Sequence, residues 1–178
     1  MQPLKFRKAE LNDVEQLLHL INQAYREDTA RSWTNEAKLV SGSRIDEQQL
    51  QQALADQNFH LYVAEINNDL STLSIVACIG LTFNHNEVEI GTFCVDPIFQ
   101  NTGIGKTVLS FAEAQALLIQ PNLDVCVMFV LDIRTELLAY YQRRGYRLTE
   151  QKISYPLEAN VGQPLKQIEL QQMLKNIK

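Results

Sequence analysis

The sequence predicts an α/β (α+β) protein with a mixed central β-sheet of about seven strands and helices on both faces. Runs that are alternating or continuously apolar, as in strands, are interspersed with segments whose apolar residues recur at helical spacing. A short turn joins two early strands as an antiparallel hairpin, whereas a later strand–helix–strand order requires a parallel pair. A mixed sheet satisfies both observations.

The first half of the chain is predicted to contain four strands and two helices. Asn12 or Asp13 precedes apolar residues that recur at helical spacing as far as Tyr25, and Asp46 is expected to cap a second helix. Residues 26–44 between these helices are polar and irregular. Asn84–Asn86 has the composition of a hairpin turn. The strands are expected at Leu4–Lys8, Phe59–Ile66, Leu73–Phe83 and Glu87–Val95.

The second half is predicted to alternate helices and strands. A helix over Gly105–Ile119 ends before Pro121, and the continuously apolar segment Asp124–Leu131 is typical of a buried strand. Asp132 or Thr135 is expected to cap a helix that runs to Gly145. The late strands are expected at Tyr146–Tyr155 and Gln167–Leu174, separated by a loop over Pro156–Pro164, although the composition of the last segment also fits a helix.

Composition predicts one domain over residues 1–178 and excludes several function classes. The 178 residues are 46% hydrophobic, which suits a single domain with a sizeable core. A net charge of −5 argues against nucleic acid as a partner. Cys78, Cys94 and Cys126 lie in apolar runs without metal-ligand spacing, so we expect reduced, buried thiols and no metal. Without a signal peptide or a membrane-spanning run, the chain is expected to be cytoplasmic, with no membrane partner.

A glycine-containing stretch, QNTGIGKT at residues 100–107, stands between a strand-like run and a predicted helix. A P-loop would need glycine where Gln100 stands, and a dinucleotide fingerprint would need it at Val108. Glycines and a helix N-terminus nevertheless place backbone N–H groups where they can bind phosphate. The stretch therefore predicts an anion site for a compound other than a nucleoside triphosphate or NAD, with a simple helix-capping turn as the alternative.

Two motifs, in order, resemble the GNAT family of N-acetyltransferases. In TFCVDPIFQNTGIGKTVL, Val95 and Pro97 precede Gln100, Gly103 and Gly105, in the pattern of the family's acetyl-CoA loop. In YYQRRGY, an aromatic residue and a glycine stand near the end of the following helix, as in the family. The predicted order of elements is also similar over nearly the whole chain. The resemblance implies a GNAT-type acyl-CoA fold and acetyl-CoA as co-substrate.

The resemblance also implies where the coenzyme binds. Its pyrophosphate would contact backbone N–H groups of the glycine loop, and its pantetheine arm would follow a strand that diverges from Val125–Leu131. Arg134 stands where many family members have asparagine, and it could contact a phosphate or a substrate carboxylate, or face solvent. The implied coenzyme residues are Phe93, Cys94, Val95, Gln100, Asn101, Thr102, Gly103, Ile104, Gly105, Lys106 and Arg134.

Acetyl transfer to an amine requires a base for the amine and a proton for the departing thiolate. Glu87 and Glu89 are two residues apart on one strand, so we expect both to face one way as candidate bases. Glu89 is preferred to Glu87 because it is nearer the expected reaction centre, and a solvated strand face is the alternative for both. Val88, Ile90 and Cys94 are expected to face the other way. His85 is a weaker candidate base in a polar turn.

Tyr141 matches the family position whose phenol lies near the sulfur, and it is the candidate acid. Core packing of Tyr141 is the alternative, and its neighbour Tyr140 also stays open as the acid.

The acceptor is expected to be a small-molecule amine or a peptide amine. By resemblance it binds near Tyr25, Arg31, Trp33 and Arg44, where arginines beside aromatic rings could hold an amine that bears a carboxylate. An ordinary surface loop would have the same composition. A homodimer is left open. The competing functions are a non-catalytic acetyl-CoA sensor and a degenerate P-loop phosphohydrolase.

Overall fold

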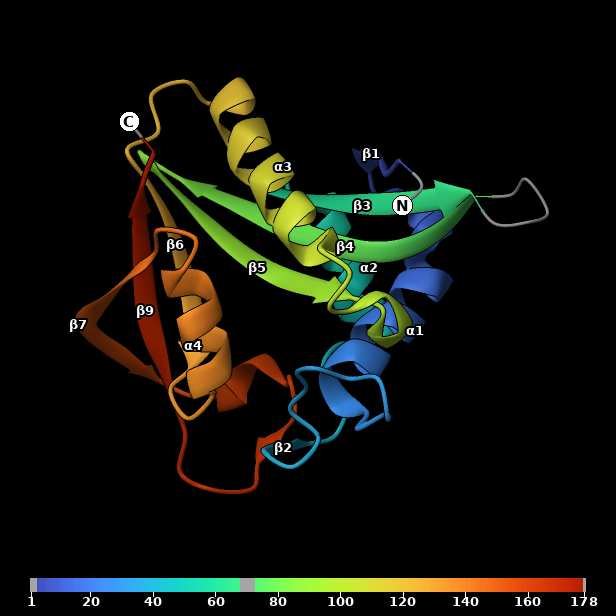
Figure 1. Ribbon diagram of the computed structural model, residues 1–178, viewed down its shortest axis with the longest axis vertical. Coiled ribbons are helices and arrows are strands. Elements are labelled where there is room, and N and C mark those ends of the chain that lie inside the picture. Colours follow the sequence, from blue (N-terminus) through green and yellow to red (C-terminus); the bar gives the residue numbers. More distant parts are fainter. Residues whose placement is uncertain (1–2, 68–72, 178) are drawn as a thin grey trace.

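The computed structural model describes residues 3–67 and 73–177, and its centre is a mixed seven-stranded sheet in the order β1-β3-β4-β5-β6-β9-β7 (Figure 1). All neighbouring strands are antiparallel except β5 and β6, which are parallel. A separate pair, β2 and β8, is also antiparallel. The elements are β1 (Lys5–Lys8), α1 (Val14–Arg26), β2 (Val40–Ser41), α2 (Glu47–Ala55), β3 (Phe59–Asn67), β4 (Leu73–Asn84), β5 (Glu87–Val95), α3 (Ile104–Ile119), β6 (Val125–Leu131), α4 (Thr135–Gln142), β7 (Arg147–Ser154), β8 (Gln163–Pro164) and β9 (Glu169–Asn176).

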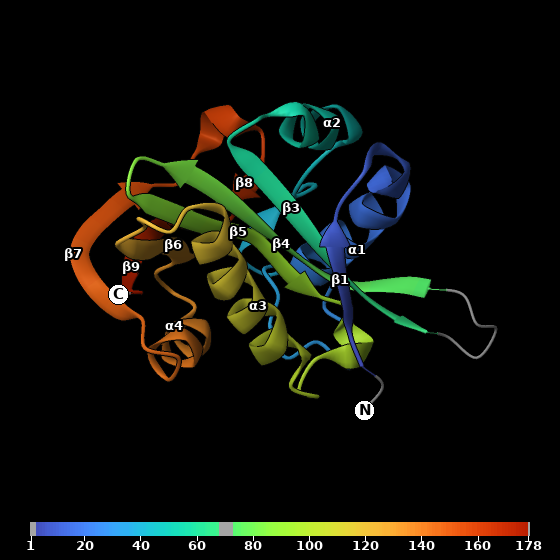
Figure 2. The same ribbon diagram turned by 90° about the horizontal axis from the view of Figure 1, so that it is seen from above.

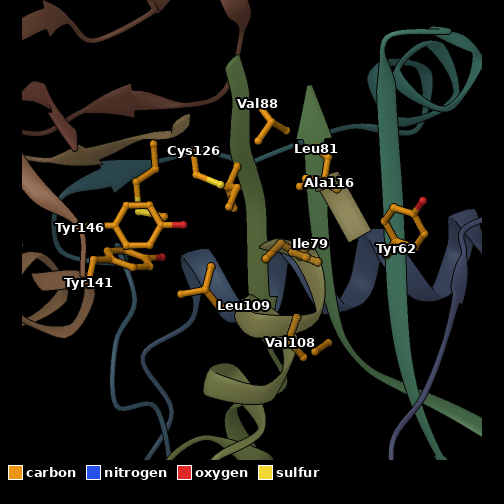
Figure 3. Close-up of a cluster of buried hydrophobic side chains, with 14 of the residues drawn as sticks. Tyr62, Ile79, Leu81, Val88, Val108, Leu109, Ala116, Cys126, Tyr141 and Tyr146 are labelled. Atoms are coloured by element: carbon orange, nitrogen blue, oxygen red, sulfur yellow. The ribbon is translucent and has the colours of Figure 1, made fainter. Parts of the chain in front are cut away.

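Helices cover both faces of the sheet, which confirms the predicted fold class (Figure 2). Helices α3 and α4 pack on one face, where Val108 and Leu109 contact a cluster that includes Ile79 and Leu81 (Figure 3). Helices α1 and α2 pack on the other face, and Leu17 belongs to that second cluster. The single parallel pair differs from the long parallel sheet that a P-loop phosphohydrolase would need.

Helix starts follow from local chemistry, with one difference from expectation. Asp46 caps α2 as predicted, since its carboxylate accepts a hydrogen bond from the Gln49 N–H (2.8 Å) in a capping box. Asp13 precedes α1, but its carboxylate makes no capping bond to that helix. It instead accepts hydrogen bonds from the Arg7 guanidinium (2.6 and 2.8 Å), so the predicted capping residue forms an ion pair with β1.

The structure differs from the predicted elements at the end of α4 and by two short strands. Helix α4 begins at Thr135 and ends at Gln142, and Gly145, with φ of +90°, follows in the left-handed conformation that helix ends favour. The last segment is strand β9, as predicted, and the alternative of a helix is wrong. Strands β2 and β8 were not predicted, because two residues in each are too few to form an alternating pattern.

Strand β5 contains a bulge that makes one expectation wrong. Gly80 pairs with Gly91 and Cys78 pairs with Cys94, so β5 has one residue more than β4 over this interval. Thr92 adopts a φ of +43° at this point. The extra residue reverses the alternation of side chains. Cys94 therefore packs on the α1 side of the sheet, whereas Val88 and Ile90 pack on the α3 side.

Candidate active site

Strands β5 and β6 diverge, and a cleft opens where they separate. They pair only through Glu87–Glu89 and Val125–Val127, and Figure 1 shows them close at one end and apart at the other. The predicted divergence of these strands is therefore present. A cleft of about 590 Å³ lies here, lined by the C-terminal half of β5, by β6, by the glycine loop, by α4 and by the end of α1. It connects the two helical layers through the interior of the sheet.

The glycine loop presents backbone N–H groups to this cleft. Helix α3 begins at Ile104, and the first N–H groups of a helix have no partner within it. Asn101 (φ +62°) and Gly103 (φ +92°) are both left-handed, a conformation that turns neighbouring N–H groups toward a common point. Thr102 and Ile104 do not line the cleft, so only their backbone groups could bind a ligand.

The two glycines of the loop serve different purposes. A Cβ at Gly103 would meet no atom within 4 Å, so this glycine is required for its left-handed backbone. A Cβ at Gly105 would lie 3.1 Å from the Tyr140 hydroxyl and 3.7 Å from a methyl of Val95. Gly105 therefore keeps space free between β5 and α4, on the cleft side of the loop.

The Gln100 side chain joins two walls of the cleft. Its Nε2 donates to the Val95 carbonyl (3.1 Å), and its Oε1 accepts from the N–H of Trp33 (2.6 Å). Its own backbone N–H donates to the Pro97 carbonyl (3.4 Å). Gln100 thus holds the segment after α1 against the end of β5, a structural role that the sequence did not indicate.

The candidate bases differ in position. Glu89 lines the cleft, and although its side chain is accessible there, the surrounding protein removes enough water to raise the pKa of its carboxyl group. Glu87 and His85 do not line the cleft. Within the β4–β5 turn, His85 uses its carbonyl oxygen as an acceptor for the Gln120 amide. Geometry therefore favours Glu89 among the three.

Both candidate acids line the cleft. Tyr141 is only 7% exposed, and burial raises the pKa of its phenol above the usual range, so the phenol stays protonated. Its ring lies 5.9 Å from that of Tyr146 (Figure 3). Tyr140 is half-buried between Trp33, whose ring is 5.5 Å away, and the Arg144 guanidinium, 3.3 Å from the ring centroid. Tyr141 therefore combines core packing with access to the cleft.

The expected acceptor residues divide into two groups. Tyr25 and Trp33 line the cleft, and the Tyr25 hydroxyl donates to the Phe93 carbonyl (3.1 Å) on β5. Arg31 does not line the cleft, and it stands in a turn that is closed by a hydrogen bond from the Ser32 N–H to the Thr29 carbonyl (3.0 Å). The exposed Arg31 instead borders a shallow surface hollow beside the glycine loop.

Arg134 lies in a buried ion network that sequence analysis did not find. Its guanidinium contacts the Glu36 carboxylate (2.9 Å), and the same carboxylate pairs with Arg26. The three side chains are 7–9% exposed, so the alternative of a solvent-facing Arg134 is wrong. Glu36 and Arg134 are 98 residues apart in the chain, and no local pattern could have predicted their contact.

Among residues 3–67 and 73–177, no group of three or more histidine, cysteine, aspartate or glutamate side chains is placed to hold a metal ion. In the same part of the chain, every helix is too short or too polar to span a lipid bilayer.

Comparison with known proteins identifies the family. The family model described as "Acetyltransferase (GNAT) family" matches residues 18–146, so the chain belongs to this family. It is accordingly an acyltransferase that uses acetyl-CoA. No curated protein matches the chain at the level of sequence.

Solved structures share the fold at low sequence identity. The ribosomal-protein-S18-alanine N-acetyltransferase of Escherichia coli is 15% identical, with a TM-score of 0.68 over 99% of this chain and 95% of that one. The ribosomal-protein-alanine N-acetyltransferase of Brucella melitensis is 21% identical, with a TM-score of 0.68 over 97% and 99%. A GNAT acetyltransferase of Elizabethkingia anophelis, solved with acetyl-CoA bound, is 18% identical, with a TM-score of 0.65 over 98% of both chains.

Proposed function

We propose that the protein transfers the acetyl group of acetyl-CoA to a primary amine by direct attack of the amine on the thioester. The observation that carries this proposal is the cleft between β5 and β6, which connects the glycine loop on the α3 side with Glu89 on the α1 side. Two reactants can therefore enter from opposite faces of the sheet and meet in the gap between the strands.

The glycine loop is proposed to bind the coenzyme. Backbone N–H groups from Asn101 to Lys106 would hold the pyrophosphate, and the Lys106 ammonium adds a positive charge at the cleft. Phe93 to Val95 do not pair with β6, and this edge of β5 would bind the amides of the pantetheine arm beside the Phe93 and Val95 carbonyls, which already accept from Tyr25 and Gln100. Arg134 already contacts the Glu36 and Glu136 carboxylates, so we assign it to holding α4 and not to direct phosphate binding.

Glu89 and Tyr141 are proposed to move the protons. A protonated amine is not a nucleophile, and the raised pKa of Glu89 makes this carboxylate a better proton acceptor than an ordinary glutamate. The neutral phenol of Tyr141 would donate a proton to the thiolate when the carbon–sulfur bond breaks. The amine nitrogen forms the new bond to the acetyl carbon as the carbon–sulfur bond breaks. The nitrogen loses two protons, of which Glu89 takes one and the other returns through solvent to the Tyr141 phenolate, so that the products are an amide and the free thiol.

The direct test is an assay with acetyl-CoA and a panel of amines that detects free thiol. Acetyl-CoA should also raise the melting temperature, because a ligand specific to the folded state stabilises it. Acetylated product would exclude a non-catalytic sensor, whereas binding without any product across the panel would support one. Three reduced cysteines support a cytoplasmic location as a further proposal, which fractionation of cells would test.

A further inference from the structure

Arg44 is a half-buried arginine in the cleft, and within the described residues its guanidinium has no acidic or hydrogen-bonding partner. Arg26 and Arg134, by contrast, share the Glu36 carboxylate. The Arg44 guanidinium lies above the Tyr25 ring, 5.3 Å from its centroid, and lines the cleft. A partly desolvated cation without a counterion is a site for an anion.

The backbone at Arg44 is held in place by α1. The Asn22 side-chain oxygen accepts from the N–H groups of Arg44 (2.7 Å) and Ile45 (3.3 Å), and its nitrogen donates to the Ile45 carbonyl (3.0 Å). The cation–π contact with Tyr25 then fixes the direction of the side chain. A site that is organised before binding loses less entropy when the ligand arrives.

The position of Arg44 separates it from the coenzyme phosphates. Asn22 and Tyr25 belong to α1, which packs on the face of the sheet opposite α3, whereas the glycine loop begins α3 (Figure 2). Glu89 projects toward the α1 face, since its neighbours Val88 and Ile90 pack toward α3. Arg44 and the proposed base therefore lie on the same side of the sheet, in the acceptor half of the cleft.

The charged side chains in the acceptor half of the cleft favour a substrate that has two charged groups. Its carboxylates are Glu36, which two arginines already neutralise, and Glu89, which is proposed to receive the proton of the amine. Resting on the proposed function, we infer that the acceptor is an aminocarboxylate of amino-acid size, whose carboxylate binds Arg44 while its amine is placed for attack. A polyamine, which carries only positive charge, would be repelled by Arg44.

The test compares matched pairs of acceptors. Each amino acid is assayed with acetyl-CoA beside the amine that lacks its carboxylate, for example phenylalanine beside phenethylamine, with spermidine as a polyamine. The parent protein should prefer the carboxylate member. Arg44→Gln should lower kcat/KM for that member by about tenfold to a hundredfold, as expected for a charge-assisted contact. It should leave the rate for the matched amine and the Kd for acetyl-CoA within twofold.

Control variants keep the result interpretable. Arg44→Lys retains the charge and should recover part of the preference, and Arg147→Gln, an exposed arginine on β7 outside the cleft, should change nothing. Equal or better rates with phenethylamine or spermidine in the parent protein would overturn the inference and leave acetyl transfer intact. If a folded Arg44→Gln variant lost the same factor in kcat/KM for the amino acid and for its matched amine, the inference would also be wrong. Acetyl-CoA binding without acetylation of any acceptor would overturn the proposed function, and this inference with it.

Discussion

Glu36→Gln should destabilise the protein by removing the one negative charge between two buried arginines. The Glu36, Arg26 and Arg134 side chains are 9%, 9% and 7% exposed, so the two guanidinium groups would be left poorly solvated. Loss of one partner from a buried ion pair typically costs about 3–5 kcal/mol. Arg26 keeps hydrogen bonds to the Gly42 carbonyl (3.0 Å) and the Val161 carbonyl (2.6 Å), which favours the lower end, about 3 kcal/mol.

Thermal and denaturant unfolding would measure this cost. For a protein of this size about 3 kcal/mol corresponds to a Tm lower by about 6–12 °C. Glu136→Gln is the matched control, because Glu136 contacts the same Arg134 at 3.5 Å but is 45% exposed. An exposed pair contributes at most about 1 kcal/mol. If both variants unfold at the same temperature, or if Glu36→Gln is the more stable, the assigned role of the buried network is wrong.

Three further predictions concern the cleft. Tyr141→Phe should lower single-turnover rates by about 100-fold and leave the Kd for acetyl-CoA unchanged, whereas Tyr140→Phe should change either value little. If Tyr140→Phe were the slower variant, the assignment of Tyr141 as the acid would be wrong. Burial raises the pKa of Tyr141, so the parent rate should not fall through phenol ionisation below about pH 10. Glu89→Gln should lower kcat/KM by about 100-fold. The parent kcat/KM needs the deprotonated carboxylate, so it should decline as pH falls through a value above the ordinary glutamate pKa of about 4.3. If the variant kept the pH profile of the parent, Glu89 would be excluded as the base. Gly105→Val should weaken acetyl-CoA binding in calorimetry, because its side chain would enter the space beside Tyr140, and unchanged affinity in a folded variant would count against the loop as the coenzyme site.

The order of the larger elements could be predicted because their patterns are local. Helix α1 has buried residues at Val14, Leu17 and Ile21, the spacing that one helical face requires. The bulge in β5 could not be predicted in the same way. Threonine at position 92 does not favour a positive φ, so nothing in the sequence indicated that Cys94 would change faces.

The site could be predicted best where a motif carries it. The glycine loop and Tyr141 belong to two short motifs, and both line the cleft. The contacts of Glu36 and Gln100 depend on segments that meet only after folding, and their sequence neighbours give no sign of them. Arg31 and Arg44 both stand in a polar stretch, and only the fold shows that Arg44 lines the cleft while Arg31 does not.

The divergence of β5 and β6 leaves strand edges inside the molecule. Beyond Glu89 and Val127, the sheet is hydrogen-bonded as two smaller sheets, β1-β3-β4-β5 and β6-β9-β7. An exposed strand edge recruits any extended chain that offers amide groups, as in peptide recognition by β-augmentation. A ligand with amides along an extended arm can therefore hydrogen-bond to this interior edge in the way that a short additional strand would. Such a ligand would bridge the two smaller sheets where they are not hydrogen-bonded to each other, and its departure would leave this part of the β5 edge open again.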